Sequence, residues 1–206
     1  MLNQLPPNMT QNSYLEIIIG SMKSGKTSRL TEIYKQCKYC GISVVAINHE
    51  IDTRYDENMM TTHDGIKVPC IKASKLMDLY IDEINLDTYN KIGNITSKLA
   101  VAMSDVILIN EAQFFPDLEE FVKKMLEKEK KIYICGLDGD FRRNKFGHVL
   151  DLIPLCDKVV KLTSLCGICK NGTPGIFSKR ITTETEQTIV GSDNYIPVCR
   201  KCYEKC

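Results

Sequence analysis

Short apolar runs recur along the chain. The first, Leu15 to Ile19, is aliphatic apart from Glu16 and rich in isoleucine, and a glycine-containing loop follows it directly. Further runs occur within residues 42–48, 101–110, 131–136 and 159–163. Runs of this length without a polar face predict strands that are buried on both sides, as in parallel sheets.

The segments between these runs include three with helical spacing. They cover residues 28–40, 73–80 and 116–130. The last mixes acidic and basic residues, which suits the solvated face of an amphipathic helix. Strands that alternate with helices predict an α/β fold, in which a parallel sheet is flanked by helices on both faces. Ligands of such folds collect at the carboxyl ends of the strands, so functional residues are expected there.

A glycine loop lies between the first strand and the first helix. The phrase Gly20-Ser21-Met22-Lys23-Ser24-Gly25-Lys26-Thr27 fits the pattern G-x-x-x-x-G-K-[ST] in that required context. Backbone N–H groups of such a loop and the N-terminus of the following helix bind phosphate, so all eight residues are expected to contact ATP. Lys26 is expected to reach the β- and γ-phosphates, and the Thr27 hydroxyl to bind Mg²⁺. The alternative is a chance glycine turn.

Composition narrows the class of ligand. In 206 residues, Lys plus Arg total 27 and Asp plus Glu total 26. The basic excess typical of nucleic-acid or anionic-membrane binding is therefore missing. No apolar run approaches the roughly 20 residues that span a bilayer, and the N-terminus does not resemble a signal peptide. We expect a cytoplasmic protein that acts on a small molecule, and a disordered leader at residues 1–13.

Cysteines mark a second module near the C-terminus. Of the 10 cysteines, four form the knuckles Cys166-x-x-Cys169 and Cys199-x-x-Cys202. In an intracellular chain this pairing indicates metal, and four thiolates suit a closed, structural Zn²⁺ site. Free thiols or an oxidative disulfide are the alternatives. We therefore expect an ATP-binding α/β domain at residues 14–163 and a zinc-ribbon domain at 164–206, with Cys135 in the apolar core.

An acidic residue stands at the end of the third predicted strand. Glu111 is placed there to face the phosphate loop across the crevice. A carboxylate in that position can accept the proton of an attacking hydroxyl, or it can serve Mg²⁺. A helix-capping glutamate is the alternative without a catalytic role. Phe114 close by either packs in the core or holds a flat nucleobase.

Several phrases occur together in one order. They are the phosphate loop with its methionine, Asp52-Thr53-Arg54-Tyr55, Thr62-His63-Asp64, Glu111-Ala112-Gln113-Phe114-Phe115-Pro116-Asp117, Leu137-Asp138-Gly139-Asp140-Phe141, Lys145-Phe146-Gly147 and both knuckles. In this combination the chain resembles the zinc-containing, cytosolic type of thymidine kinase over nearly all of residues 15–203. The resemblance implies transfer of the γ-phosphate of ATP to the 5′-hydroxyl of thymidine. It also implies a homotetramer and feedback inhibition by dTTP.

The resemblance assigns roles to single residues. Glu111 matches the family's base. Arg54 would place positive charge near the transferring phosphoryl group, although an exposed ion pair is its alternative role. The positions that match the thymine pocket are Met22, Phe114, Leu137 and Phe141. A lasso between the knuckles closes over the nucleoside in the family, and its counterparts here are Ser178, Thr188, Ile189, Val190 and Gly191, with Tyr195 either near the sugar or in packing.

Departures from the family pattern affect three places. Asn110 stands where the family usually has aspartate, so we expect Asn110→Asp to lower the Mg²⁺ concentration that gives half-maximal activity. Val190 stands where glycine is common in the lasso. Residues 79–97 look longer than in compact members and form either a surface connection or a subunit contact.

Two other functions fit parts of the same pattern. A phosphate-loop ATPase could use its zinc ribbon to contact nucleic acid, but the balanced charge speaks against it. A nucleoside monophosphate kinase would need basic residues for the acceptor's phosphate, and Arg142-Arg143 alone is too little to establish them.

Overall fold

The structure is a computed structural model that describes residues 13–52, 58–83, 95–187 and 194–205. Most of the expected leader lies outside the described residues. The same holds for Arg54 and for the lasso positions Thr188, Ile189, Val190 and Gly191.

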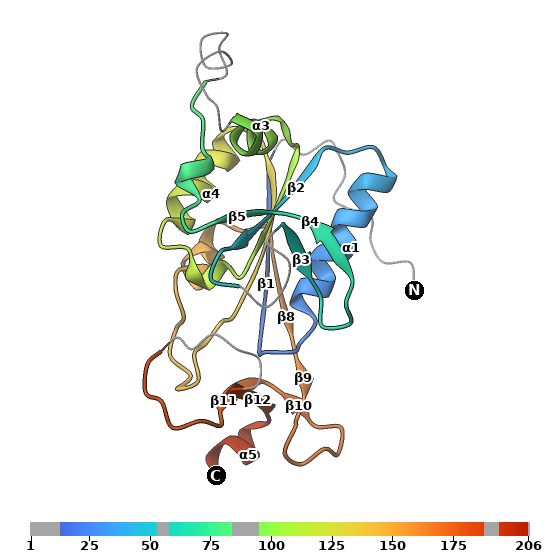
Figure 1. The fold of residues 1–206 in the computed structure, drawn as a ribbon. Coiled ribbons are helices and arrows are strands. Elements are labelled where there is room, and N and C mark those ends of the chain that lie inside the picture. The colour runs from blue at the N-terminus through green and yellow to red at the C-terminus, as the bar shows by residue number, and fades with distance from the viewer. Residues whose placement is uncertain (1–12, 53–57, 84–94, 188–193, 206) are drawn as a thin grey trace.

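A six-stranded sheet forms the centre of the protein (Figure 1). In spatial order its strands are β5 (Ile71–Ala73), β2 (Val44–His49), β6 (Val106–Asn110), β7 (Lys131–Gly136), β1 (Tyr14–Gly20) and β8 (Lys158–Leu162). Every neighbouring pair is parallel. The strands therefore deliver their carboxyl ends to one edge of the sheet, where ligands of α/β folds bind. The predicted α/β fold with a parallel sheet is confirmed.

Helices cover both faces of this sheet (Figure 1). Ile17 of β1 packs into a core with α3 (Ile95–Met103), α4 (Leu118–Glu127) and η3 (Val149–Leu155). Ile18 points the other way, into a core with α1 (Lys26–Tyr39) and the hairpin of β3 (Met59–Thr61) and β4 (Lys67–Pro69). Burial on both sides explains why the strands read as continuous apolar runs. None of the described helices has the length and apolar character needed to cross a bilayer.

The helix predicted at residues 73–80 is wrong. Strand β5 ends at Ala73, and only one 3-10 turn, η1 (Met77–Leu79), follows it. The Asp117 carboxylate accepts hydrogen bonds from the N–H groups of Leu76 and Met77 at 3.1 and 2.8 Å. A side chain from another segment thus satisfies donors at the start of the turn, so a longer helix is not needed to bury Leu76 and Leu79.

Helix α3 was not predicted. Its apolar residues run almost without a break into those of β6, and the sequence pattern alone merges the two into one apolar region. Ser104 and Asp105 separate them in the structure, where the Asp105 N–H donates to the Ser43 carbonyl at 3.1 Å.

The residues after β8 form a small module at the carboxyl edge of the sheet (Figure 1). Its elements are β9 (Ser164–Leu165), β10 (Pro174–Gly175), β11 (Phe177–Arg180), β12 (Tyr195–Val198) and α5 (Arg200–Glu204). Strand β9 pairs with β10, and β11 with β12, both antiparallel. The fully buried hydrophobic residues of its core are only Cys166, Val198 and Cys199 among the described residues. A core of this size needs a further source of stability, such as a metal.

Candidate active site

The phosphate loop curls tightly at the end of β1. Gly20 lies so close to β8 that a Cβ there would be 2.2 Å from the Leu162 carbonyl oxygen. Gly25 precedes α1 with a left-handed φ of 86°, a conformation that glycine adopts without strain. The Lys26 ammonium folds back on the loop and donates to the carbonyl oxygens of Gly20 and Ser21 at 3.1 and 2.7 Å. The Lys26 ammonium thus lies within the loop that was predicted to bind phosphate.

The C-terminal module holds this loop in place. The Ser21 hydroxyl donates to the Gly175 carbonyl at 2.6 Å, and the Met22 N–H donates to the Ser178 hydroxyl at 2.9 Å. Ser21 and Ser178 are both buried. Ser178 was predicted to bind substrate, and it lines the same cavity as the phosphate loop. Its hydrogen bond ties the C-terminal module to the phosphate loop.

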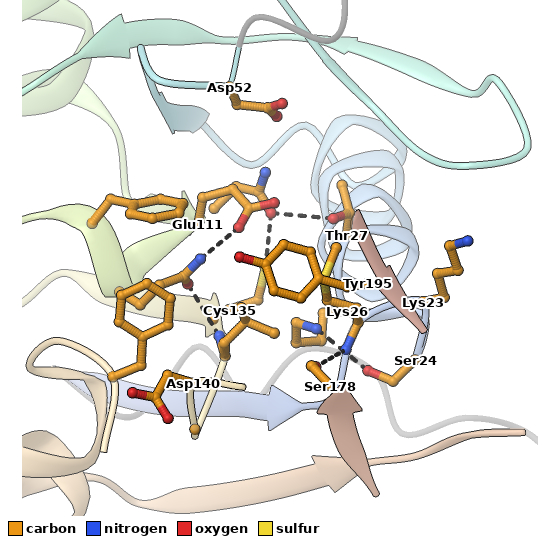
Figure 2. A pocket seen from close by; sticks show the side chains of 18 of the residues that line it. Lys23, Ser24, Lys26, Thr27, Asp52, Glu111, Cys135, Asp140, Ser178 and Tyr195 are labelled. Carbon is orange, nitrogen blue, oxygen red and sulfur yellow. Dashed lines mark hydrogen bonds between the residues drawn. The ribbon is translucent and has the colours of Figure 1, made fainter. Parts of the chain in front are cut away.

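Glu111 occupies the position predicted for it, at the carboxyl end of β6. Figure 2 shows its carboxylate and the Thr27 hydroxyl entering the same space. Its backbone φ is 52°, a left-handed conformation that costs a non-glycine residue about 1–2 kcal/mol. Such strain persists where the surrounding structure enforces it, which is common at functional sites.

Gln113 orients the Glu111 carboxylate. Its Nε2 donates to Glu111 Oε2 at 2.7 Å, while its Oε1 accepts the Leu137 N–H at 3.0 Å. Gln113 is buried, so these bonds fix one orientation of the amide. The sequence placed Gln113 in a matched phrase but gave it no role. The available signal in the sequence was an amide side chain two residues after the candidate base.

A chain of polar side chains continues from Thr27 into the sheet. The Thr27 hydroxyl is 3.3 Å from Asn110 Oδ1, which also accepts the Cys135 thiol at 2.9 Å. Asn110 Nδ2 donates to Asn48 Oδ1 at 3.0 Å, and Asn48 Nδ2 donates to Asp52 Oδ2 at 3.2 Å. Neither Asn48 nor a polar role for Cys135 was predicted. Cys135 is buried as expected, but it lines the cavity as well.

His49 orders the segment that carries Asp52. Its Nδ1 accepts the Ile51 N–H at 3.1 Å, and its ring packs edge-on against Phe115 with the centroids 4.7 Å apart. Burial lowers the pKa of this imidazole below the ordinary 6.5. His49 is therefore neutral at pH 7 and keeps a lone pair for the Ile51 N–H. The sequence gave no role to this residue.

Flat and apolar side chains line the cavity beside Glu111. All four residues predicted for a thymine pocket are among them, namely Met22, Phe114, Leu137 and Phe141. Tyr195 lines the cavity too, in front of the phosphate loop in Figure 2. Phe146 was quoted in a matched phrase without a role, and it packs edge-on against Phe114 with the centroids 5.5 Å apart. Phe115, in contrast, is fully buried in the core. Aromatic walls of this kind suit a flat ring.

Arg180 joins this pocket to the chain that leads into the lasso. Its guanidinium donates to the carbonyl oxygens of Glu184, Glu186 and Gln187 and to the Tyr195 hydroxyl oxygen. The same group lies 3.8 Å from the centroid of the Phe141 ring. Arg180 is buried, and no sequence signal pointed to it. The geometry makes it an anchor that fixes Phe141 and Tyr195 relative to each other.

For thymidine, the substrate that the resemblance implies, we expect Arg180→Lys to raise KM at least about tenfold, the equivalent of about 1.4 kcal/mol. Lysine can neither make several fixed hydrogen bonds in one plane nor stack on Phe141 in the same way. The KM for ATP should change much less. Arg200→Lys is the matched control, because Arg200 is exposed and lies over Phe177 outside the cavity. Equal changes in both KM values would contradict the anchoring role.

The predicted zinc ligands come together in the C-terminal module. The Sγ atoms of Cys166, Cys169, Cys199 and Cys202 all lie within 4.8 Å of one another. Burial opposes a charge on Cys166, but hydrogen bonds from the backbone at Cys169, Cys199 and Ile168 outweigh it and lower the pKa of this thiol to about 6. A hydrogen bond with Cys199, together with burial, raises the pKa of the Cys202 thiol to about 12, so without a metal Cys166 is favoured as thiolate and Cys202 is not. The convergence of four sulfurs fits a tetrahedral metal site, and they could hold Zn²⁺.

We expect one zinc per chain by elemental analysis, and we expect Cys199→Ser to release it. The thymidine affinity should fall more than the ATP affinity. The module supplies Tyr195, and the Tyr203 hydroxyl donates to the Phe141 carbonyl at 2.7 Å. The phosphate loop has two hydrogen bonds to the module but also keeps its own strand and helix. Cys40→Ser, a change at an exposed free cysteine, is the control. A full zinc content in Cys199→Ser would refute this ligand set.

Comparison with known proteins agrees with this geometry. The thymidine kinase family model matches residues 13–203. Thymidine kinase a of Arabidopsis thaliana is 41% identical over 191 residues, which are 92% of this chain and 74% of that protein. The thymidine kinase of Yaba monkey tumor virus is 36% identical over 197 residues, 95% of this chain and 97% of that protein. With a family match over nearly its whole length, the chain belongs to the thymidine kinase family.

Proposed function

We propose that this protein is an ATP-dependent thymidine kinase that forms dTMP. The observation that carries the proposal is one cavity with two unlike walls. Lys26 and Thr27 of the phosphate loop line one side, and Figure 2 shows Glu111 facing Thr27. The aromatic residues Phe114 and Phe141 line the same cavity. A triphosphate on the loop and a nucleoside base between the aromatic rings would bring the γ-phosphate and the 5′-hydroxyl together next to a carboxylate.

Each residue has a defined task in this reaction. Lys26 holds the β- and γ-phosphates and compensates the charge that develops on them. Glu111 accepts the proton of the 5′-hydroxyl as its oxygen attacks the γ-phosphorus. A new O–P bond forms, the bond to the β-phosphate oxygen breaks, and ADP leaves. Arg54 is proposed to add positive charge near the transferred group.

Two metals complete the proposal. The Thr27 hydroxyl offers a hard oxygen donor beside the phosphate loop, which suits Mg²⁺ together with the ATP phosphates. The metal would neutralise phosphate charge there. Zn²⁺ on the four cysteines would hold the ends of the lasso, whose proposed contacts with thymidine are Ser178, Thr188, Ile189, Val190 and Gly191. A closed four-thiolate site leaves no position for substrate, so that metal is structural.

Regulation and assembly are proposed from the family resemblance. dTTP carries a thymine for the aromatic pocket and a triphosphate for the same cavity, so it is the expected feedback inhibitor. A homotetramer and a cytoplasmic location are proposed as well. Four thiols kept reduced in a metal cluster fit a reducing compartment.

An acceptor assay tests the proposed function against its rivals. Purified protein is given labelled ATP and either thymidine, dTMP or single-stranded DNA. Label in dTMP, with thymidine as acceptor, supports the proposal. Phosphorylation of dTMP alone would show a nucleoside monophosphate kinase, and phosphate release stimulated by DNA would show a nucleic-acid-dependent ATPase.

A further inference from the structure

A chain of four side chains runs from the phosphate loop to a buried acid. They run from Thr27 through Asn110 and Asn48 to Asp52, with contacts of 3.3, 3.0 and 3.2 Å. Asn48, Asp52 and Asn110 are all buried. Strand β2 supplies Asn48 and the neighbouring strand β6 supplies Asn110, and the two residues are direct partners in the parallel register. Figure 2 shows Asp52 set back from the loop, beyond Glu111.

The direction of this chain is fixed from both ends. The Asp52 carboxylate only accepts hydrogen bonds, so Asn48 must turn its amide NH₂ toward it and its Oδ1 toward Asn110. At the other end, burial raises the pKa of the Cys135 thiol to about 12, so this thiol remains a donor and must meet Asn110 Oδ1. Both ends therefore require the same orientation of Asn110, with Oδ1 toward Thr27.

We propose that Asp52 is a positioning residue that acts through Asn48 and Asn110 to hold the Thr27 hydroxyl. The carboxylate connected to this hydroxyl is then Asp52, which lies beyond two amide side chains. It is not at position 110, next to Glu111. Asn110 then serves as an amide that both donates and accepts hydrogen bonds in this chain, a role that an aspartate at position 110 could not fill beside Asn48 and Asp52. The role in catalysis rests on the proposed function, but the direction of the hydrogen bonds does not.

For Asn110→Asp, the proposal predicts losses of stability and of turnover, which the expectation of a lower Mg²⁺ requirement did not include. A carboxylate at position 110 would face Asn48 Oδ1, and two acceptors in contact repel each other. Turning the Asn48 amide would only move the conflict, because its Oδ1 would then face the Asp52 carboxylate. No rotation of Asn48 satisfies two buried carboxylates at once. Exchanging the acid and the amide removes the conflict. In D52N/N110D the Asn48 NH₂ group can donate to the acid at position 110 while its Oδ1 accepts from the amide at position 52, so the hydrogen bonds among these four side chains are kept with the chain reversed.

A double-mutant cycle on the protein without substrates tests this directly. N110D and D52N should each lower Tm, and the double variant should lie at least about 2 °C above the value expected from adding the two losses. The control cycle pairs N110D with Glu111→Gln. This pair also leaves the net charge of the protein unchanged, because N110D adds one negative charge and Glu111→Gln removes one from the neighbouring residue, but it cannot reverse the hydrogen-bond chain. It should show much weaker coupling. Additive losses in D52N/N110D, or equal coupling in both cycles, would overturn the proposal.

Kinetics then test the positioning role. N110D should lower kcat at least about tenfold with little change in the KM for thymidine, because a displaced Thr27 hydroxyl affects the transfer step rather than the nucleoside pocket. D52N/N110D should recover most of this kcat. Recovery of Tm without recovery of kcat would leave the hydrogen-bond chain intact but refute its role in positioning Thr27. A protein without kinase activity would refute the proposed function and leave the Tm cycle to decide on the chain.

Discussion

Lys26→Ala is expected to reduce phosphoryl transfer by at least about a thousandfold. The Lys26 ammonium is the cation that the phosphate loop itself places against Gly20 and Ser21. Its loss leaves charge on the phosphates uncompensated at a half-buried position, where electrostatic interactions are stronger than in bulk water. Initial rates at saturating ATP and thymidine measure the effect.

Two further variants make this result specific. Lys26→Met keeps most of the apolar stem and removes the charge, so it should be nearly as inactive as the alanine variant while retaining the packing of the loop. Lys35→Ala changes an exposed lysine of the same helix, and it should leave the rate unchanged. Near-normal turnover in Lys26→Met would remove Lys26 from the site.

Glu111→Gln is expected to lower kcat by about 10²–10⁴-fold and to leave thymidine binding nearly unchanged. An amide has the shape of the carboxylate without its basicity. Its oxygen can still accept the hydrogen bond that Gln113 Nε2 now donates to Glu111 at 2.7 Å, so the local structure should persist. Thymidine affinity by calorimetry and kcat by product formation separate the two effects.

The control for this change is Glu119→Gln. Glu119 lies on α4 in an exposed ion pair with Lys123, with a contact of 2.7 Å, and such pairs contribute little to stability. This variant should behave like the unmodified protein. Loss of thymidine binding with an unchanged kcat in Glu111→Gln would make Glu111 a structural residue.

The parts of the site that could be proposed from the sequence are local in the chain. The phosphate loop is a strand, a glycine turn and a helix in succession, so a single stretch of chain contains its whole signal. Glu111 was found because an acid directly follows an apolar run, and the carboxyl ends of parallel strands meet at one edge. The cysteine knuckles carry their own spacing. In each case chemistry and position could be read from a few consecutive residues.

The parts that were not predicted depend on which strands become neighbours. Asn48 meets Asn110 only because β2 lies beside β6, and Asn110 meets Cys135 only because β7 lies on its other side. Sequence spacing does not contain this order. Arg180 was missed for a related reason: its partners at Phe141 and Tyr195 come from different segments. Helix α3 was missed because its apolar residues merge with those of β6 in the sequence. A helix was wrongly predicted at residues 73–80 because the Asp117 carboxylate that satisfies the N–H groups of Leu76 and Met77 comes from a distant segment.

Identification of the product tests the central claim most directly. The protein is incubated with thymidine and ATP labelled at the γ-phosphate, and the products are separated and examined by phosphorus NMR and mass spectrometry. The account predicts thymidine 5′-monophosphate that carries the label, with one ADP formed for each dTMP. Release of inorganic phosphate without labelled dTMP, or label on a different hydroxyl, would contradict it.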